Sequence, residues 1–216
     1  MKLYLDSANP NDWTLPAGVP AIAGVTTNPT LVRRAGREVT LPTYLDLIRQ
    51  AGKGRIRELM LQMPRPDSGE ISAWLAELMP AAARERVQLT IKLPCHPDWA
   101  HALETVQDHG LPTLLTGLSN PMQLMWAVER GASWVAPYIG RLEDANRDVL
   151  SLLHACVRAQ NEGPGLLAAS VKSPDVLARL MGMGAAAVTI APALVREWIT
   201  DPVTDAAIAQ FNADVG

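Results

Sequence analysis

The chain has 216 residues, 48% hydrophobic and 19% charged, so it is long enough to bury one core, and we expect a single domain over residues 1–216. A formal net charge of −3 excludes a basic field, and no window approaches the roughly 20 apolar residues of a membrane span, so we expect a small substrate, with no nucleic acid and no membrane as partner. Two cysteines exclude a disulfide framework and the first residues lack a signal peptide, which predicts a cytoplasmic protein.

Eight short apolar or β-branched runs follow one another along the chain, and a segment with helical character follows each of them. The runs predicted as strands are 3–6, 21–28, 57–63, 87–94, 112–117, 134–139, 166–171 and 187–192. The clearest helix begins at Ser68, where apolar residues recur three and four positions apart. Asn120 and Ser173, each followed by proline, are predicted N-caps of two later helices.

Strand and helix alternation implies a parallel α/β sheet, either open and doubly wound or closed into a barrel. Polar residues occupy the last inward-compatible position of the first seven runs, namely Asp6, Asn28, Gln62, Lys92, Thr116, Tyr138 and Ser170. An open sheet covered by helices has little room for them, whereas a barrel gathers its strand ends into one pocket. The pattern therefore favours a (β/α)8 TIM barrel. No G-x-G-x-x-G or P-loop motif indicates a nucleotide site.

Lys92 is the sharpest candidate for chemistry. It lies on the polar face of the run VQLTIKLP, whose other face is aliphatic. An amine among apolar walls loses hydration of its charged form, so its pKa falls and the neutral nitrogen becomes a nucleophile. The alternative is a structural ion pair with Asp6, which itself could transfer a proton or simply neutralise the lysine.

Two further sets of residues have functional and structural interpretations side by side. Tyr138, Gln62 and Thr116 could hold a water for proton transfer, or could make ordinary core hydrogen bonds. Arg141 with Ser170 and Lys172 could bind phosphate, or Arg141 could pair with Glu143 or Asp144 at the surface. The four histidines have no metal-ligand spacing, so we predict no metal.

The segments LYLDSAN, GVTTNPTL, IKLP, WVAPYIGRLED and LAASVKSP carry a resemblance to a known family. In order, from residue 3 to about residue 212, they resemble the signature segments of the transaldolases, in particular the short fructose-6-phosphate aldolase branch. The resemblance implies a barrel in which a lysine on the fourth strand forms a Schiff base with a ketose, without metal or other cofactor. Lys92 matches that lysine.

The resemblance also implies roles for other residues. Asp6 matches the aspartate that handles the C4 hydroxyl of the substrate, and Asn28 matches the asparagine that holds the dihydroxyacetone unit, with Thr26 in the same segment as a further substrate contact. Arg141 and Ser170 match the phosphate ligands, and Lys172 lies nearby. Small sugar phosphates and hydroxyketones are therefore the expected substrates.

Some positions bear on which branch the chain resembles. Gln62, Tyr138, Leu114 and Ala136 are similar to the aldolase branch, whereas IGRLEDAN is closer to the small transaldolases. We therefore expect an aldolase that interconverts fructose 6-phosphate with dihydroxyacetone and glyceraldehyde 3-phosphate, with transaldolase transfer as the alternative and a catalytically silent sugar-phosphate-binding barrel as a third interpretation. A register slip would exchange Gln62 with Glu58, four residues earlier on the same strand face.

The last segment, VTDAAIAQFNADV, has Val203, Ala207, Ile208 and Phe211 on one helical stripe. By resemblance, such a helix packs on a neighbouring subunit, which implies a homo-oligomer, with decamers in the short branch. The alternative is that the helix caps its own barrel.

Overall fold

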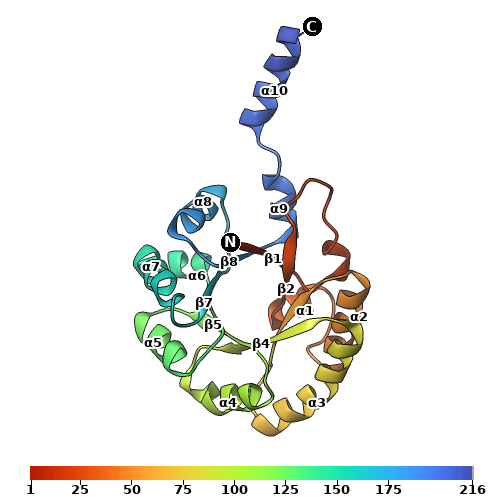
Figure 1. The fold of residues 1–216 in the computed structure, drawn as a ribbon, viewed down its shortest axis with the longest axis vertical. Helices are drawn as coiled ribbons and strands as arrows, with labels where there is room; N and C mark the ends of the chain where they lie inside the picture. Colours follow the sequence, from red (N-terminus) through yellow and green to blue (C-terminus); the bar gives the residue numbers. More distant parts are fainter. Residues whose placement is uncertain (216) are drawn as a thin grey trace.

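The computed structural model describes residues 1–215, which form a closed barrel of eight parallel strands in sequence order, with β8 paired to β1 (Figure 1). The strands are β1 (Lys2–Asp6), β2 (Ile22–Thr26), β3 (Glu58–Gln62), β4 (Gln88–Pro94), β5 (Thr113–Leu118), β6 (Trp134–Pro137), β7 (Gly165–Ala168) and β8 (Ala187–Ile190). The predicted (β/α)8 TIM barrel is thus confirmed, and every predicted run overlaps one strand.

Helices follow the strands and surround the barrel, except the last one (Figure 1). They are α1 (Pro29–Arg34), α2 (Leu41–Lys53), α3 (Ser68–Glu85), α4 (Ala100–Asp108), α5 (Pro121–Glu129), α6 (Ile139–Asp144), α7 (Val149–Ala159), α8 (Pro174–Met183), α9 (Pro192–Trp198) and α10 (Pro202–Val215), with short 3-10 helices η1 (Pro10–Asp12) and η2 (Pro97–Trp99). Among the described helices, none has the length and apolar content to cross a membrane.

Three strands, β2, β6 and β7, end before the polar residue predicted at their last position, so these three residues lie in the loops beyond them. Asn28 follows β2 and caps α1, and Tyr138 follows β6 and precedes α6. Ser170 follows β7 with a left-handed φ of 60°, a conformation that ends an extended run. The prediction that these residues belong to the strands was wrong, although they remain at the carboxyl ends of their strands.

The predicted helix starts at two prolines are confirmed. The Asn120 side chain accepts a hydrogen bond from the backbone N–H of Gln123, and Ser173 accepts one from Val176. Each cap satisfies one donor that the first helical turn leaves free. These caps fix where α5 and α8 begin, and α8 begins directly after the segment that carries Ser170.

Side-chain alternation divides the core into two layers. The larger cluster lies between the sheet and the helices, and a small cluster fills the barrel interior with Tyr4, Met60, Leu114, Ala136, Leu167 and Ala187. Because interior-facing positions alternate with outward ones along every strand, the polar residues at the strand ends lie directly above this apolar interior.

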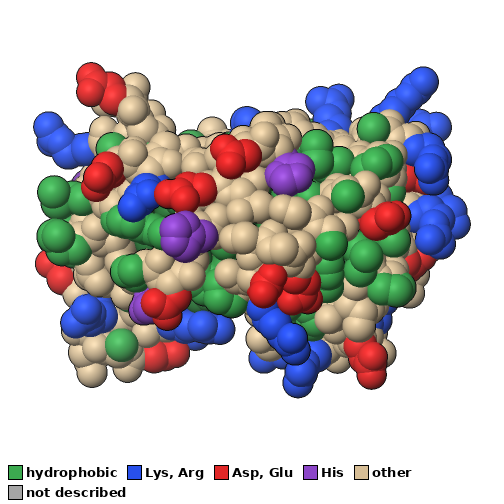
Figure 2. Space-filling view, turned by 90° about the horizontal axis from the view of Figure 1, so that it is seen from below, with side chains coloured by type: hydrophobic (Ala, Val, Ile, Leu, Met, Phe, Trp, Pro, Cys, Tyr) green, Lys and Arg blue, Asp and Glu red, His purple; other side chains and the backbone are tan. Residues whose placement is uncertain are grey.

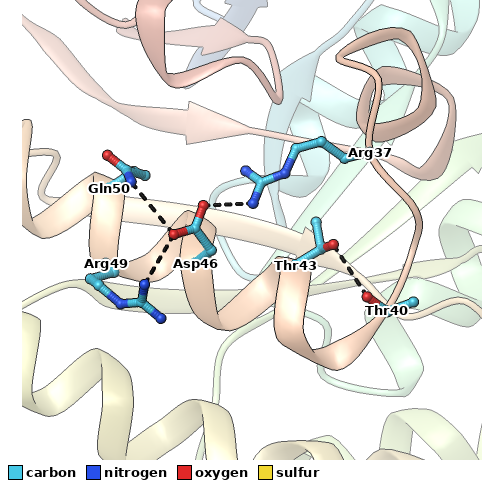
Figure 3. Close-up of polar contacts among 6 residues, drawn as sticks. All are labelled: Arg37, Thr40, Thr43, Asp46, Arg49 and Gln50. Carbon is cyan, nitrogen blue, oxygen red and sulfur yellow. Dashed lines mark hydrogen bonds and ion pairs between the residues drawn. The ribbon is translucent and has the colours of Figure 1, made fainter.

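The connection from α1 to α2 is held by an ion-pair cluster (Figure 3). Arg37, in the connection, donates to Asp46 of α2 at 2.6 Å, and Arg49 donates to the other carboxylate oxygen at 3.2 Å. Burial opposes the charge of Asp46, but hydrogen bonds from Arg37 and Gln50 and the arginine charges outweigh it, so the Asp46 pKa lies below its usual value. The cluster anchors the loop that leaves the barrel mouth after α1.

Helix α10 extends away from the barrel into solvent (Figure 1), and none of its residues is buried. The alternative prediction, that this helix caps its own barrel, is therefore wrong. Three large apolar side chains of the predicted stripe, Val203, Ile208 and Phe211, are exposed. On the opposite part of the molecule, acidic and basic side chains are interspersed across the face that Figure 2 shows.

Candidate active site at the barrel mouth

A cavity of about 330 Å³ opens at the carboxyl ends of the strands. Eight of the ten predicted site residues line it, namely Asp6, Asn28, Lys92, Thr116, Tyr138, Arg141, Ser170 and Lys172. The other two, Thr26 and Gln62, do not line it and lie beside residues that do. Its apolar floor includes Leu114, Ala136 and Leu167 from the interior cluster.

Lys92 is the buried cation of this cavity. Its relative exposure is 4%, and its ammonium nitrogen donates to the backbone oxygen of Thr27 at 2.5 Å. Burial lowers the pKa of Lys92 to about 8, and the nearby Asp6 charge opposes that shift only in part. Lys92 makes no ion pair with any residue from 1 to 215. The predicted alternative of a Lys92–Asp6 ion pair is therefore not what the structure contains.

Asp6, at the end of β1, is held by Thr26 of the neighbouring strand β2, and Thr26 in turn contacts β8. The Thr26 hydroxyl of β2 donates to Asp6 Oδ1 at 2.8 Å and also lies 2.7 Å from the Thr189 hydroxyl of β8. Thr26 is fully buried behind Asp6, and its hydroxyl is used in both of these contacts. The structure thus places Thr26 where it orients the carboxylate, away from the cavity wall on which substrate contacts were expected.

Tyr138 contacts two other residues of the cavity wall: its hydroxyl pairs with that of Thr116, and its ring lies against Arg141. The Thr116 hydroxyl donates to the Tyr138 phenol oxygen at 2.7 Å, which leaves the Tyr138 proton free to point elsewhere. Burial raises the pKa of Tyr138 and the Asp6 charge adds to this, whereas Thr116 and Arg141 act in the opposite direction. The phenol therefore keeps its proton at neutral pH and can donate a hydrogen bond.

The register of β3 separates Gln62 from Glu58. Gln62 lies opposite Lys92 on β4, and its Oε1 is buried without a hydrogen-bond partner in the described residues. Glu58 lies one layer deeper and accepts hydrogen bonds from Tyr4 at 2.7 Å and Thr90 at 2.6 Å. Gln62 is therefore at the level of the lysine, and its Oε1 is a buried acceptor that no donor of the described residues satisfies.

The side of the cavity near β6 and β7 gathers positive charge and hydroxyl donors. Gly140 gives them space, because a Cβ built there would lie 2.6 Å from Lys172 Cε and 3.0 Å from Ser170 Oγ. Lys172 lies 3.8 Å from Asp144, and both side chains are exposed, so this contact holds the ammonium only weakly. Arg141 forms no ion pair with Glu143 or Asp144 within residues 1–215; its guanidinium instead lies over the Tyr138 ring.

Asn28 both caps helix α1 and lines the cavity. Its Oδ1 accepts a hydrogen bond from the Leu31 backbone and so caps α1. This fixes the side chain at the cavity wall and leaves its amide N–H groups free to donate. The capping bond explains why the residue lies after the strand and still faces the cavity.

Sequence reasoning missed three polar residues of the wall, Thr30, Arg34 and Thr189. Thr189 was detectable, because it is an inward-facing position of the eighth run. Thr30 and Arg34 lie on the short helix α1, where no periodic signal marks a cavity. Within residues 1–215, no group of three or more His, Cys, Asp or Glu residues is arranged to hold a metal ion.

The sequence is similar to one protein family and to individual curated proteins over nearly its whole length. The family described as transaldolase/fructose-6-phosphate aldolase matches residues 3–215. A probable transaldolase of Ruegeria pomeroyi is 29% identical over 223 residues, which cover 100% of this chain and 96% of the relative. Probable transaldolases of Rhodospirillum centenum (29% identity, 99% and 90% coverage) and Methanococcus maripaludis (30% identity, 99% and 97% coverage) are similar to it as well.

Proposed function

Because the chain belongs to the transaldolase/fructose-6-phosphate aldolase family, we propose that it is a transaldolase, which moves a dihydroxyacetone unit between sugar phosphates through a Schiff base on Lys92. The relatives that are called probable transaldolases favour transfer over the release of dihydroxyacetone, which the sequence led us to expect first. In either case the cleaved bond is the C3–C4 bond of a ketose phosphate.

The observation that carries the proposal is Lys92, which is buried in a polar cavity and has no ion-pair partner within residues 1–215. A lysine with a pKa of about 8 has an appreciable neutral fraction at physiological pH, and the neutral amine is the nucleophile that a ketone requires. The burial cost of this amine is not offset by an ion pair in the described chain, which is typical of a functional group rather than of a stabilising one.

The proposed cycle starts when Lys92 Nζ attacks the C2 ketone and water leaves, which gives an iminium. Asp6 takes the C4 hydroxyl proton, the C3–C4 electron pair moves into the iminium, and an aldose phosphate leaves with C4 as its aldehyde carbon. The enamine that remains on Lys92 then attacks the aldehyde of an acceptor, whose oxygen recovers the proton from Asp6. Hydrolysis of the new iminium frees the product and the lysine.

In this proposal the two halves of the substrate bind to different parts of the wall. The amide of Asn28 donates to the hydroxyls of the three-carbon unit, and Arg141, Ser170 and Lys172 bind the terminal phosphate. A phosphate is well matched to this side of the cavity, because a guanidinium and an ammonium both form charge-assisted hydrogen bonds with its oxygens.

A second candidate is the aldolase, in which water ends the cycle. The Thr116–Tyr138 hydroxyl pair on the cavity wall favours it, since the pair can hold a water that protonates the enamine. In this candidate Gln62, which is buried opposite Lys92, would be a further partner of that water. Protonation followed by hydrolysis releases dihydroxyacetone without any acceptor. The two candidates share every step up to the enamine. They differ only in whether the enamine then reacts with an acceptor aldehyde or takes a proton from water.

The experiment that tests the proposal measures glyceraldehyde 3-phosphate release from fructose 6-phosphate, with and without erythrose 4-phosphate. A transaldolase turns over only with the acceptor, whereas steady release without it establishes the aldolase. Lys92→Met is the matched control, because it keeps the length of the side chain and removes the amine. No release under either condition, from a folded protein, would favour the silent sugar-phosphate-binding barrel.

We also propose that the protein is a homo-oligomer in which α10 packs on a neighbouring subunit. A helix with Val203, Ile208 and Phe211 exposed on one stripe, and with no buried residue, has apolar surface that a second copy can cover. The decamer of the short branch is the assembly that the resemblance implies. A cytoplasmic location fits Cys95 and Cys156, which are both free thiols.

A further inference from the structure

The guanidinium of Arg141 contacts an aromatic ring that belongs to the cavity. Its guanidinium carbon lies 4.7 Å from the centroid of the Tyr138 ring, within the range of a cation–π contact. The two residues are three positions apart at the start of α6, which places them on adjacent turns of the chain. Both line the cavity.

The other end of the same tyrosine takes part in a buried hydrogen bond. Thr116, which is 4% exposed on β5, donates to the phenol oxygen. The ring of Tyr138 therefore connects an exposed arginine at the mouth with a fixed hydroxyl deeper in the cavity.

We propose that Arg141 is a positioning residue as well as an anion ligand: by stacking on Tyr138, it couples phosphate binding at the cavity mouth to the orientation of the Tyr138 hydroxyl during proton transfer. The inference rests on the Schiff base of the proposed function and on the role that the aldolase candidate gives to the Tyr138 hydroxyl, and it adds a role for the phosphate. The phosphate of the substrate helps to organise the residues that act on the other half of the molecule.

The physical reason is the freedom of an exposed arginine. Arg141 is exposed and has no ion pair in the described part of the chain, so several side-chain rotamers compete with the stacked one. A phosphate bound to Ser170 and Lys172 selects the Arg141 rotamer that can also donate to the same phosphate. If that rotamer is the stacked one, the anion shifts the population toward a fixed Tyr138.

Deuterium exchange into dihydroxyacetone isolates the proton-transfer step. Lys92 condenses with the ketone and releases water, the iminium loses a proton from the adjacent carbon, and the resulting enamine takes up a deuteron from D₂O-exchanged water or hydroxyl. Hydrolysis then returns the lysine and the labelled ketone. One C–H bond is replaced by one C–D bond, and the reaction needs no aldehyde and no oxidant.

The probe for the anion site is phosphite, added separately. We expect saturating phosphite to accelerate exchange by the wild-type protein on the order of tenfold, a typical effect of improved orientation, at constant ionic strength set with chloride. Tyr138→Phe, which keeps the ring and removes the hydroxyl, should lose this acceleration. Arg33→Gln is the charge-matched control, because Arg33 is exposed on α1 and does not line this cavity; it should retain the acceleration.

Arg141→Lys separates binding from positioning. The lysine keeps a positive charge for phosphite but lacks the planar guanidinium that stacks on a ring. We expect phosphite to remain bound, measured by its competition with fructose 6-phosphate for borohydride trapping, while the acceleration disappears. Arg141→Gln should lose both. Because binding and acceleration are measured separately, a general loss of structure would not reproduce this pattern.

Three results would overturn the inference. Phosphite could fail to accelerate the wild-type protein, it could accelerate Arg141→Lys as strongly as wild type, or Tyr138→Phe could keep the acceleration. A different result, no exchange and no borohydride adduct with dihydroxyacetone at any phosphite concentration, would refute the Schiff base on Lys92 and the proposed function with it.

Discussion

At the scale of single residues, Lys92 shows that the cavity is maintained at the expense of stability. Its pKa of about 8, against 10.5 for a free lysine, corresponds to roughly 3 kcal/mol that the charged amine loses on burial. The unfolded chain therefore binds a proton at Lys92 more tightly than the folded chain does. The contribution of Lys92 to the free energy of unfolding therefore rises with pH between the folded pKa of about 8 and the free-lysine pKa of 10.5, and it is lowest below pH 8.

Lys92→Met tests this cost. The variant lacks the titrating amine, so its free energy of unfolding relative to wild type should fall by roughly 3 kcal/mol as the pH rises from neutral to above 10.5. The unpaired Thr27 carbonyl adds a constant penalty that does not depend on pH. Urea unfolding across this pH range measures the difference, and a difference independent of pH would mean that Lys92 is solvated in the folded protein.

The pH dependence of activity has the same origin. In the proposed mechanism the neutral amine attacks the ketone, so kcat/KM should increase with pH and level off above a pKa near 8, provided that Schiff-base formation limits the rate. A pH profile measured with fructose 6-phosphate reports this value. A plateau reached only near the pKa of a free lysine would contradict the burial of Lys92.

Gly140→Ala tests the space at the anion side of the cavity. The new Cβ would lie 2.7 Å from Lys172 Nζ, so the ammonium must move, and we expect KM for a phosphorylated ketose to rise about tenfold, the loss of one charge-assisted contact. Gly182→Ala on α8 is the control, because nothing lies within 4 Å of its added Cβ. Equal KM values for the two variants would remove Lys172 from phosphate binding.

Some residues of the candidate site were predictable and others were not, for identifiable physical reasons. Alternation along a strand says which face a side chain occupies, so Asp6, Lys92 and Thr116 could be assigned to the interior. It does not say whether a hydroxyl on that face is free, and Thr26 lies behind Asp6 because of hydrogen bonds that only the folded barrel makes.

At the scale of elements, strand ends were the weakest part of the sequence prediction. The apolar character of the chain continues past β2, β6 and β7, but the backbone leaves the sheet as soon as a cap or a left-handed residue intervenes. Asn28 reads as the end of a strand and acts as a helix cap. The existence and order of the elements were predictable because hydrophobic periodicity extends over many residues, whereas boundaries depend on single residues.

Helix α3 contains a proline that its own stability does not explain. Pro80 is exposed in the middle of the helix, where it removes a backbone hydrogen bond. Pro80→Ala should therefore raise the free energy of unfolding, by up to about 3 kcal/mol before the greater freedom of the unfolded alanine chain is subtracted. Glu77→Ala on the same helix is the control, with an expected change within about 0.5 kcal/mol. Destabilisation by Pro80→Ala in urea unfolding would indicate that the barrel needs a bent α3.

At the scale of the whole molecule, the barrel and α10 are separable. A chain that stops after residue 200 should fold and still form a borohydride adduct with dihydroxyacetone, because α10 buries no residue in its own subunit. Its mass by light scattering should fall to that of a smaller assembly. An unchanged mass would assign the subunit contacts to another surface.

A single substitution within the intact chain gives the matched test of the same helix. Phe211→Asp places a charge on the exposed apolar stripe and should weaken assembly, since a buried unpaired charge is costly. Ala209→Asp adds the same charge on the opposite face of the helix, where the residue is exposed, and should leave the mass unchanged. Equal behaviour of the two variants would show that the stripe is not an interface.

The pairing of β1 with β8 has a consequence for how the protein is made. A nascent chain that has reached β7 holds seven strands of an open sheet, with the backbone groups of β1 and β7 exposed along its two edges. Such edges are templates for aggregation during synthesis, and no local helix can cover them in advance. The vulnerable period therefore ends only when residues 187–190 meet residues 2–5, so rare pauses in translation before that point should reduce the soluble yield more than pauses after it.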